Sequence, residues 1–147
     1  MVHIGIDPGK KGAMAVIYDD NSVYVTSFDK DKYIYYLEKL GEDNIDVRCC
    51  IEDVHAMHGN GVTASFNFGK SYGWLLGMLD TLKIPYQAVS VQKWKKEYGL
   101  TSDKSRSIEV CRRLFPNVIL KRTDRCKKDD DGLAEALLLA LYAKRHF

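Results

Sequence analysis

The stretch that decides the fold is Met1–Ile17, MVHIGIDPGKKGAMAVI. Short apolar and β-branched residues lead to one acid, Asp7, and Pro8-Gly9 then separates this run from a second apolar run. The pattern predicts two buried strands joined by a tight turn, with Asp7 at the end of the first strand. Burying a carboxylate is unfavourable unless a cation meets it. Asp7 therefore predicts a cation at this end of the strand, most simply a metal ion.

The rest of the chain predicts an α/β fold with a mixed five-stranded sheet. An antiparallel three-strand meander is followed by alternating helices and strands, and such crossovers give parallel strands with helices on both faces of the sheet. Ser102 is the expected N-cap of the helix over 103–115. We expect a single domain over 1–147, with strands at 2–7, 12–18, 22–28, 46–52 and 86–91, helices at 30–41, 63–83, 91–98, 103–115 and 130–145, and loops at 53–62 and 117–128.

The positive charge is concentrated in one third of the chain. Residues 90–128 contain twelve lysines and arginines against four acids, a net charge of +8, whereas the whole chain carries only +2. A basic segment on a nearly neutral chain indicates a surface that faces a polyanion such as nucleic acid. A solvated helical face is the alternative interpretation.

The cysteines and the apolar runs bear on location. The four cysteines form no C-x-x-C pair, which favours reduced thiols in a cytosol-like compartment. No apolar run reaches the length of a membrane span, and the first strand lacks the basic start of a signal peptide. We expect a cytoplasmic protein.

Three further acids occupy positions comparable to that of Asp7. Glu52 ends the predicted strand 46–52, and Asp131 and Glu135 open the last helix, where their spacing of four puts them on one face. In a crossover topology the first and fourth strands can be parallel neighbours, so their carboxyl ends meet where ligands bind. Carboxylates are the ligands of Mg²⁺, and two such ions about 3.5–4 Å apart catalyse phosphodiester cleavage.

Each acid also has a structural interpretation that the sequence leaves open. Asp7 could cap the Pro-Gly turn, Glu52 could be a solvated acid at the end of a strand, and Asp129–Asp131 could be dipole acids of the last helix. His55 and His58 have no cysteine pair nearby, which argues against zinc. Gly69, Gly73 and Gly77 line one face of the helix 63–83 and predict the close approach of another backbone.

Six segments follow one another along nearly the whole chain: IGIDPGKKGA, IEDVHAM, GVTASFNFGKSYGWLLGML, VQKWKKEYGL, LFPNVILKR and DGLAEALLLALYA. Together they resemble the RuvC-type Holliday junction resolvases, most closely their phage and organellar branch. The resemblance implies the RNase H-like fold, a homodimer, and paired nicking of opposing strands at a four-way DNA junction. It also implies Mg²⁺, or Mn²⁺ in its place, with two ions per active site. The compartment would be the host cytoplasm if the protein is phage-encoded, with an organelle matrix as the alternative.

The resemblance also implies roles for individual residues. The catalytic and metal-binding acids fall on Asp7, Glu52, Asp131 and Glu135, with Asp130 as a rival for the third, because the last two acids are three apart in the bacterial pattern. A junction-probing loop falls on His58–Phe68, where Phe66 and Phe68 are candidates to stack on unpaired bases, although helix core is the alternative for both. The implied DNA-binding residues are Lys93, Lys95, Lys96, Lys104, Arg106, Phe66, Phe68 and His58.

Three other functions fit parts of the pattern. A non-catalytic module that binds branched DNA would need no assembled acids, and a broader RNase H-like nuclease would also cut flaps. IDPGKKGA further resembles a phosphate loop of actin-like sugar kinases, but those enzymes need two such domains and this chain is too short for both.

Overall fold

The computed structural model describes residues 1–42, 45–55 and 59–147 of the chain. Five strands form one sheet in the order β3-β2-β1-β4-β5. The meander is antiparallel, whereas β1 with β4 and β4 with β5 are parallel, which confirms the predicted mixed sheet. The strands are β1 (Val2–Asp7), β2 (Ala13–Ile17), β3 (Val23–Ser27), β4 (Val47–Asp53) and β5 (Tyr86–Ser90).

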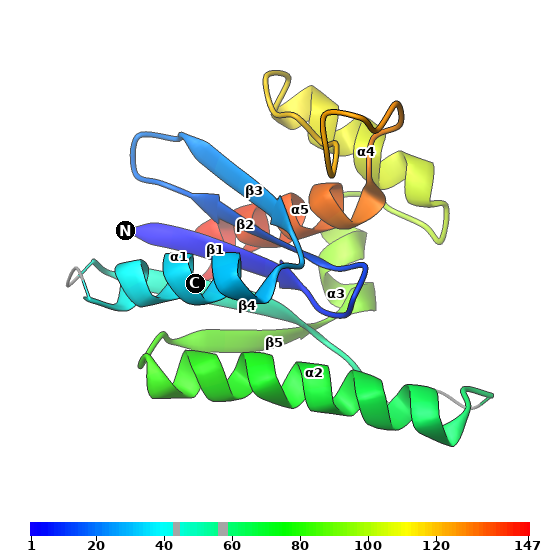
Figure 1. The fold of residues 1–147 in the computed structure, drawn as a ribbon. Helices are drawn as coiled ribbons and strands as arrows, with labels where there is room; N and C mark the ends of the chain where they lie inside the picture. Colours follow the sequence, from blue (N-terminus) through cyan, green and yellow to red (C-terminus); the bar gives the residue numbers. More distant parts are fainter. Residues whose placement is uncertain (43–44, 56–58) are drawn as a thin grey trace.

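Helices cover both faces of this sheet, as predicted (Figure 1). One core layer packs Ile4 and Ile6 of β1 against α1 and α2, and the other packs Ala13 and Cys50 against α3, α4 and α5. None of the described helices is both long and apolar enough to cross a membrane. The helices are α1 (Lys30–Glu42), α2 (Val62–Thr81), α3 (Val91–Glu97), α4 (Lys104–Leu114) and α5 (Asp131–His146).

Strand periodicity decides on which face the acids lie. Successive side chains of a strand point to opposite faces, so Asp7 shares a face with Gly5 when Ile6 points to the α1–α2 layer. In the same way Glu52 shares a face with Cys50, which packs in the α5 layer. Both acids at the sheet's carboxyl edge therefore face α5.

Gly5 allows α5 to lie directly on β1. A Cβ at this position would be 2.1 Å from the carbonyl oxygen of Ala136 and 2.2 Å from the backbone nitrogen of Ala140. Only glycine accommodates a backbone at that distance. This contact fixes α5, and with it Glu135, against the end of β1.

One local prediction is wrong, and another is not met within the described chain. The N-cap of α4 is Asp103, whose carboxylate accepts a hydrogen bond from the backbone N–H of Ser105 at 3.0 Å, and not Ser102. A Cβ added at Gly69, Gly73 or Gly77 would meet nothing within 4 Å among the described residues. The glycine face of α2 is therefore open toward the described residues of this chain, and the close approach of a backbone from a second copy stays a prediction.

Candidate metal centre and active-site cleft

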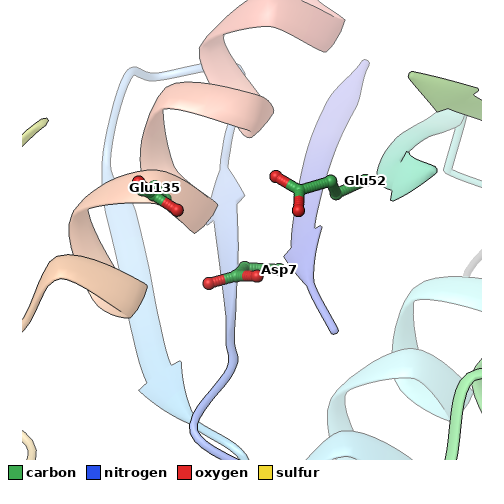
Figure 2. A group of neighbouring side chains, drawn as sticks. All are labelled: Asp7, Glu52 and Glu135. Carbon is green, nitrogen blue, oxygen red and sulfur yellow. The ribbon is translucent and has the colours of Figure 1, made fainter. Parts of the chain in front are cut away.

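Three carboxylates from three separate elements meet at the carboxyl edge of the sheet. Asp7 ends β1, Glu52 lies one residue before the end of β4, and Glu135 lies in the second turn of α5. The pairing of Ile6 with Ile51 brings the two strand ends side by side. One oxygen from each acid lies within 4.8 Å of the others, and Figure 2 shows the three carboxylates around a common space.

The electrostatics of this cluster favour a bound cation. Burial raises the pKa of Asp7 to about 8, and the charges of Glu52, Glu135 and Asp131 add to the effect. Burial also raises the pKa of Glu52, against a lowering contribution from its hydrogen bond with Trp94. A hard divalent cation would offset both the burial and the mutual repulsion, and three carboxylate oxygens are the donors it prefers. The residues present therefore fit a metal such as Mg²⁺.

The turn after Asp7 is shaped by two glycines. Gly9 has a φ of +110°, and a Cβ at Gly12 would lie 2.0 Å from the carbonyl oxygen of Asp7. The turn is closed by the N–H of Gly12, which donates to the carbonyl of Gly9 at 3.0 Å. Among the described residues, the Asp7 side chain makes no hydrogen bond to this turn, so turn capping does not explain the acid.

Both glutamates are held by donors from the helices that follow β5. The indole Nε1 of Trp94 in α3 donates to Oε2 of Glu52 at 3.0 Å. Oε1 of Glu135 accepts from the Ser107 hydroxyl of α4 at 3.1 Å and pairs with Nζ of Lys95 at 2.9 Å. Glu52 is therefore not a solvated acid at a sheet edge, because β4 is an inner strand and its carboxylate is partly buried.

The three consecutive aspartates before α5 have different surroundings. Asp130 is the N-cap, accepting from Leu133 N–H at 3.1 Å, and it also pairs with Arg122 at 2.6 Å. Asp129 pairs with Lys121 at 3.3 Å and with Arg112. Both are therefore occupied in holding the start of α5 and the loop before it.

Asp131 lies on the wall of the cleft beside the three clustered acids. It pairs with Lys104 at 3.5 Å and lies outside the group of three whose oxygens converge, although its charge contributes to the raised pKa of Asp7. Of the two rivals for a further ligand, Asp131 is thus the one whose carboxylate is not committed to a helix cap.

An open cleft of about 870 Å³ leads to the cluster. Lys10, Lys11, Lys104 and Arg122 border it, so cations surround the carboxylates. Phe68 lies at its rim, with its ring edge 3.1 Å from where a Cβ of Gly9 would be. A cleft of this kind admits an anionic ligand to a metal centre.

The other predicted nucleic-acid residues divide into two groups. Lys95 and Lys104 contact the acids Glu135 and Asp131, so they belong to the centre itself. Lys93, Lys96 and Arg106 are exposed on α3 and α4. His58 lies outside the described residues.

The two candidate stacking phenylalanines are exposed in the first turns of α2. Phe66 is 66% exposed and Phe68 is 37% exposed, so the alternative of a helix-core role is wrong for both. The helix already begins at Val62, which places both rings on regular helix and not on the predicted probing loop.

The sequence analysis did not identify Trp94 and Ser107. The sequence did indicate that both residues are buried, because residues three or four positions apart lie on the same face of a helix. Ser107 is three and four residues before Val110 and Cys111, which are buried, and Trp94 is the one large apolar residue inside the basic run QKWKK. A polar atom on such a face indicates a buried partner.

No protein-family model and no curated protein matches the sequence. Solved structures do match in three dimensions. T. thermophilus RuvC in complex with Holliday junction substrate matches with a TM-score of 0.61 at 17% identity, over 99% of this chain and 97% of that chain. The fowlpox virus resolvase in complex with its substrate Holliday junction DNA matches with a TM-score of 0.55 at 16% identity, over 97% and 98% of the two chains.

A third match is the yeast mitochondrial Holliday junction resolvase Ydc2, with a TM-score of 0.51 at 16% identity over 93% of this chain and 75% of that one. Identity at this level carries information about the fold alone. The order of the strands, the helices on both faces and these near-complete alignments agree with one another, and the chain therefore has the RuvC-type resolvase fold, a form of the RNase H-like fold.

Proposed function

We propose that this protein is a metal-dependent endodeoxyribonuclease that resolves four-way DNA junctions by nicking opposing strands. The observation that carries the proposal is the convergence of Asp7, Glu52 and Glu135 at the carboxyl edge of the sheet. Asp7 and Glu135 line a cleft that is bordered by cations. The fold it shares with RuvC and with two other resolvases supports the same substrate class. We propose further that residues 1–147 act as one nuclease domain.

The chain's own residues would divide the work as follows. Asp7, Glu52 and Glu135 hold the metal, with Asp131 as a further ligand from the wall of the cleft. When bound, two Mg²⁺ or Mn²⁺ ions supply the activation of water and the stabilisation of the departing 3′ oxygen. Lys95, whose Nζ pairs with Oε1 of Glu135 at 2.9 Å, holds this carboxylate in place.

DNA would be held by charge around the cleft and by stacking at its rim. Lys10, Lys11 and Lys104 are positioned to contact phosphates, and Lys93, Lys96 and Arg106 extend the basic surface along α3 and α4. Such contacts weaken steeply as salt rises. Phe68 is exposed beside the Asp7 turn, so an unpaired base at the crossover can stack on it.

The direct test is cleavage of a synthetic four-way junction in MgCl2. We expect paired nicks in opposing strands, no cleavage in EDTA, and much slower cleavage of linear duplex, flap and Y-shaped DNA of the same sequence. Comparable rates on all branched substrates would indicate the broader nuclease. Binding of the junction with no cleavage in Mg²⁺ or Mn²⁺ would contradict the proposal and favour a non-catalytic module.

We also propose a homodimer through α2, and the open face of that helix supports it. Val62 is 87% exposed and Phe66 is 66% exposed, and they continue the line of Gly69, Gly73 and Gly77 at helical spacing. An apolar and glycine-lined face without a covering element is suited to packing against the same helix of a second copy, which would place two cleavage centres on one junction.

Gly73→Arg is expected to convert the dimer to a monomer. The long charged side chain would project from the centre of the open face, while loss of a helical glycine stabilises the helix by up to about 1 kcal/mol. Light scattering after gel filtration measures the mass, and thermal unfolding measures the fold. Asn67→Arg, exposed on another side of the same helix, is the matched control. A dimeric Gly73→Arg variant would rule out this interface.

Asp130 and Asp131 are expected to differ in their effects. Asp131→Asn should slow junction nicking by about 10-fold or more with little change in stability, because it weakens a ligand of the centre. Asp130→Ala should reduce the free energy of unfolding by about 1–2 kcal/mol, because it removes the N-cap of α5. Nicking rates and urea unfolding of both variants check this. The opposite pattern would make Asp130 the ligand.

A further inference from the structure

We propose that Trp94 is a positioning residue of the metal centre, in which its indole N–H fixes the carboxylate of Glu52 for the metal. The inference rests on the proposed function of the acidic cluster as a metal site. It concerns a residue that is not itself a ligand and that acts through Glu52.

The bond between these two side chains is constrained at both ends. Trp94 is fully buried in the core layer beneath α5, so its ring cannot move without disturbing that layer. The indole has one donor and no acceptor, and Oε2 of Glu52 at 3.0 Å is its partner among the described residues. A buried donor without an acceptor is costly, so each side chain holds the other.

The donors around the cluster share a pattern. Trp94 uses Oε2 of Glu52, whereas Ser107 and Lys95 both use Oε1 of Glu135. In each glutamate the second oxygen accepts no hydrogen bond from the part of the chain that the structure describes. One oxygen is thus fixed by the protein and the other is left for a cation, which is how outer donors orient the ligands of metal sites.

Trp94 also links the two glutamates. Nζ of Lys95, which pairs with Glu135, lies 5.3 Å from the centre of the Trp94 ring. The Trp94 side chain thus donates to one glutamate and lies near the lysine that pairs with the other. Without the indole N–H of Trp94, the Glu52 side chain regains rotational freedom. Metal binding must then order this side chain, which weakens the affinity.

The chain contains a matched control, because it has two tryptophans. Trp74 of α2 is partly buried and packs against the opposite core layer, where its ring meets Phe28 edge-on. Trp94→Phe and Trp74→Phe therefore make the same substitution in two cores, and only the first removes a donor to a clustered acid.

The test is MnCl2 titration of the intact protein by calorimetry, with thermal unfolding of each variant in EDTA. Trp94→Phe is expected to weaken Mn²⁺ binding by about 10-fold or more, while Trp74→Phe stays within about two-fold of the unsubstituted protein. A merely structural role of Trp94 would lower the unfolding temperature without this selective loss. Equal Mn²⁺ affinity in the two variants would overturn the positioning role.

A spectroscopic measurement decides the same point even if Trp94→Phe does not fold. In Trp74→Phe the only remaining tryptophan is Trp94. Its emission should change on MgCl2 addition and saturate with the Mg²⁺ affinity that calorimetry gives for the same variant. Mg²⁺ binding without any change of emission would overturn the proposal. Failure of the unsubstituted protein to bind either metal would instead contradict the metal centre itself, and the role of Trp94 with it.

Discussion

Asp7→Asn is expected to slow junction nicking by about 1,000-fold or more while leaving junction binding intact. Asp7 lies close to the other acids of the site, since the charges of Glu52, Glu135 and Asp131 all raise its pKa. Removing its charge takes away several kcal/mol of metal and transition-state stabilisation, and each 1.36 kcal/mol is tenfold in rate. The amide keeps the size of the side chain, so the turn and the cleft stay as they are.

The measurement pairs cleavage in MgCl2 with gel-shift binding of the same junction in CaCl2. Asp53→Asn is the matched control, because Asp53 ends the neighbouring parallel strand but pairs with His55 at 3.2 Å and lies outside the cluster. We expect this control to nick at nearly the wild-type rate. If Asp7→Asn cut the junction as fast as the unsubstituted protein, the active site would lie elsewhere.

The fold was predictable because its signals are local and agree with one another. Pro8-Gly9 between two apolar runs predicted the β1–β2 turn, and a carboxylate at the end of each of two parallel strands predicted that Asp7 and Glu52 meet. Alternation along the strands then decides which face they share. These are properties of short segments, and the local preferences of those segments agree with the tertiary packing of the fold.

The environment of the acids was much less predictable. A shift of one residue in the start of α5 would make a different aspartate of the three its N-cap. The choice of Asp130 also depends on its pairing with Arg122, which lies eight residues before it. The partners of Glu52 and Glu135 lie 42 and 28 residues away in sequence. No periodicity encodes such pairings, because they follow from how α3 and α4 fold back on the sheet.

The basic segment shows the same limit. Its net charge indicated a nucleic-acid surface, but charge alone did not separate Lys95 and Lys104, which meet the acids, from Lys93 and Lys96, which face solvent. The glycines of α2 and Gly5 also differ in this way. A close backbone contact was predicted for the helix glycines, which meet none of the described residues, whereas the close contact within this chain occurs at Gly5, inside a strand.

The stability of the metal-free protein is expected to fall as pH rises from about 5 to about 8, and Asp7→Asn should remove much of that dependence. The pKa of Asp7 is raised from 3.8 to about 8 in the folded protein. Between these values the unfolded chain has released a proton that the folded chain keeps, so the free energy of unfolding decreases with pH. Above about 8 both states are ionised and the full cost of the buried charge remains.

The size of the effect follows from the same pKa difference. One pKa unit corresponds to 1.36 kcal/mol, so Asp7→Asn should raise the free energy of unfolding in EDTA by about 2 to 5 kcal/mol at pH 8. At pH 5 the gain should be smaller, because the folded wild-type protein is then protonated at Asp7. Urea unfolding at both pH values, with Asp53→Asn as the control, measures this difference between variants.

Mg²⁺ should counteract the loss of stability that the unsubstituted protein shows as pH rises. A cation binds the ionised carboxylates and displaces the proton, so stabilisation by MgCl2 should grow between pH 5 and pH 8. Asp7→Asn, which has lost a ligand, should gain little from MgCl2 at either pH. Parallel pH profiles for wild type and Asp7→Asn in EDTA would show that Asp7 is not buried against its neighbours' charges. A metal effect independent of pH would place the binding site away from Asp7. We therefore expect Asp7→Asn to be more stable than the wild type in EDTA, and the wild type to regain stability in Mg²⁺. Both results have one cause, because a bound cation offsets the cost of burying the Asp7 carboxylate.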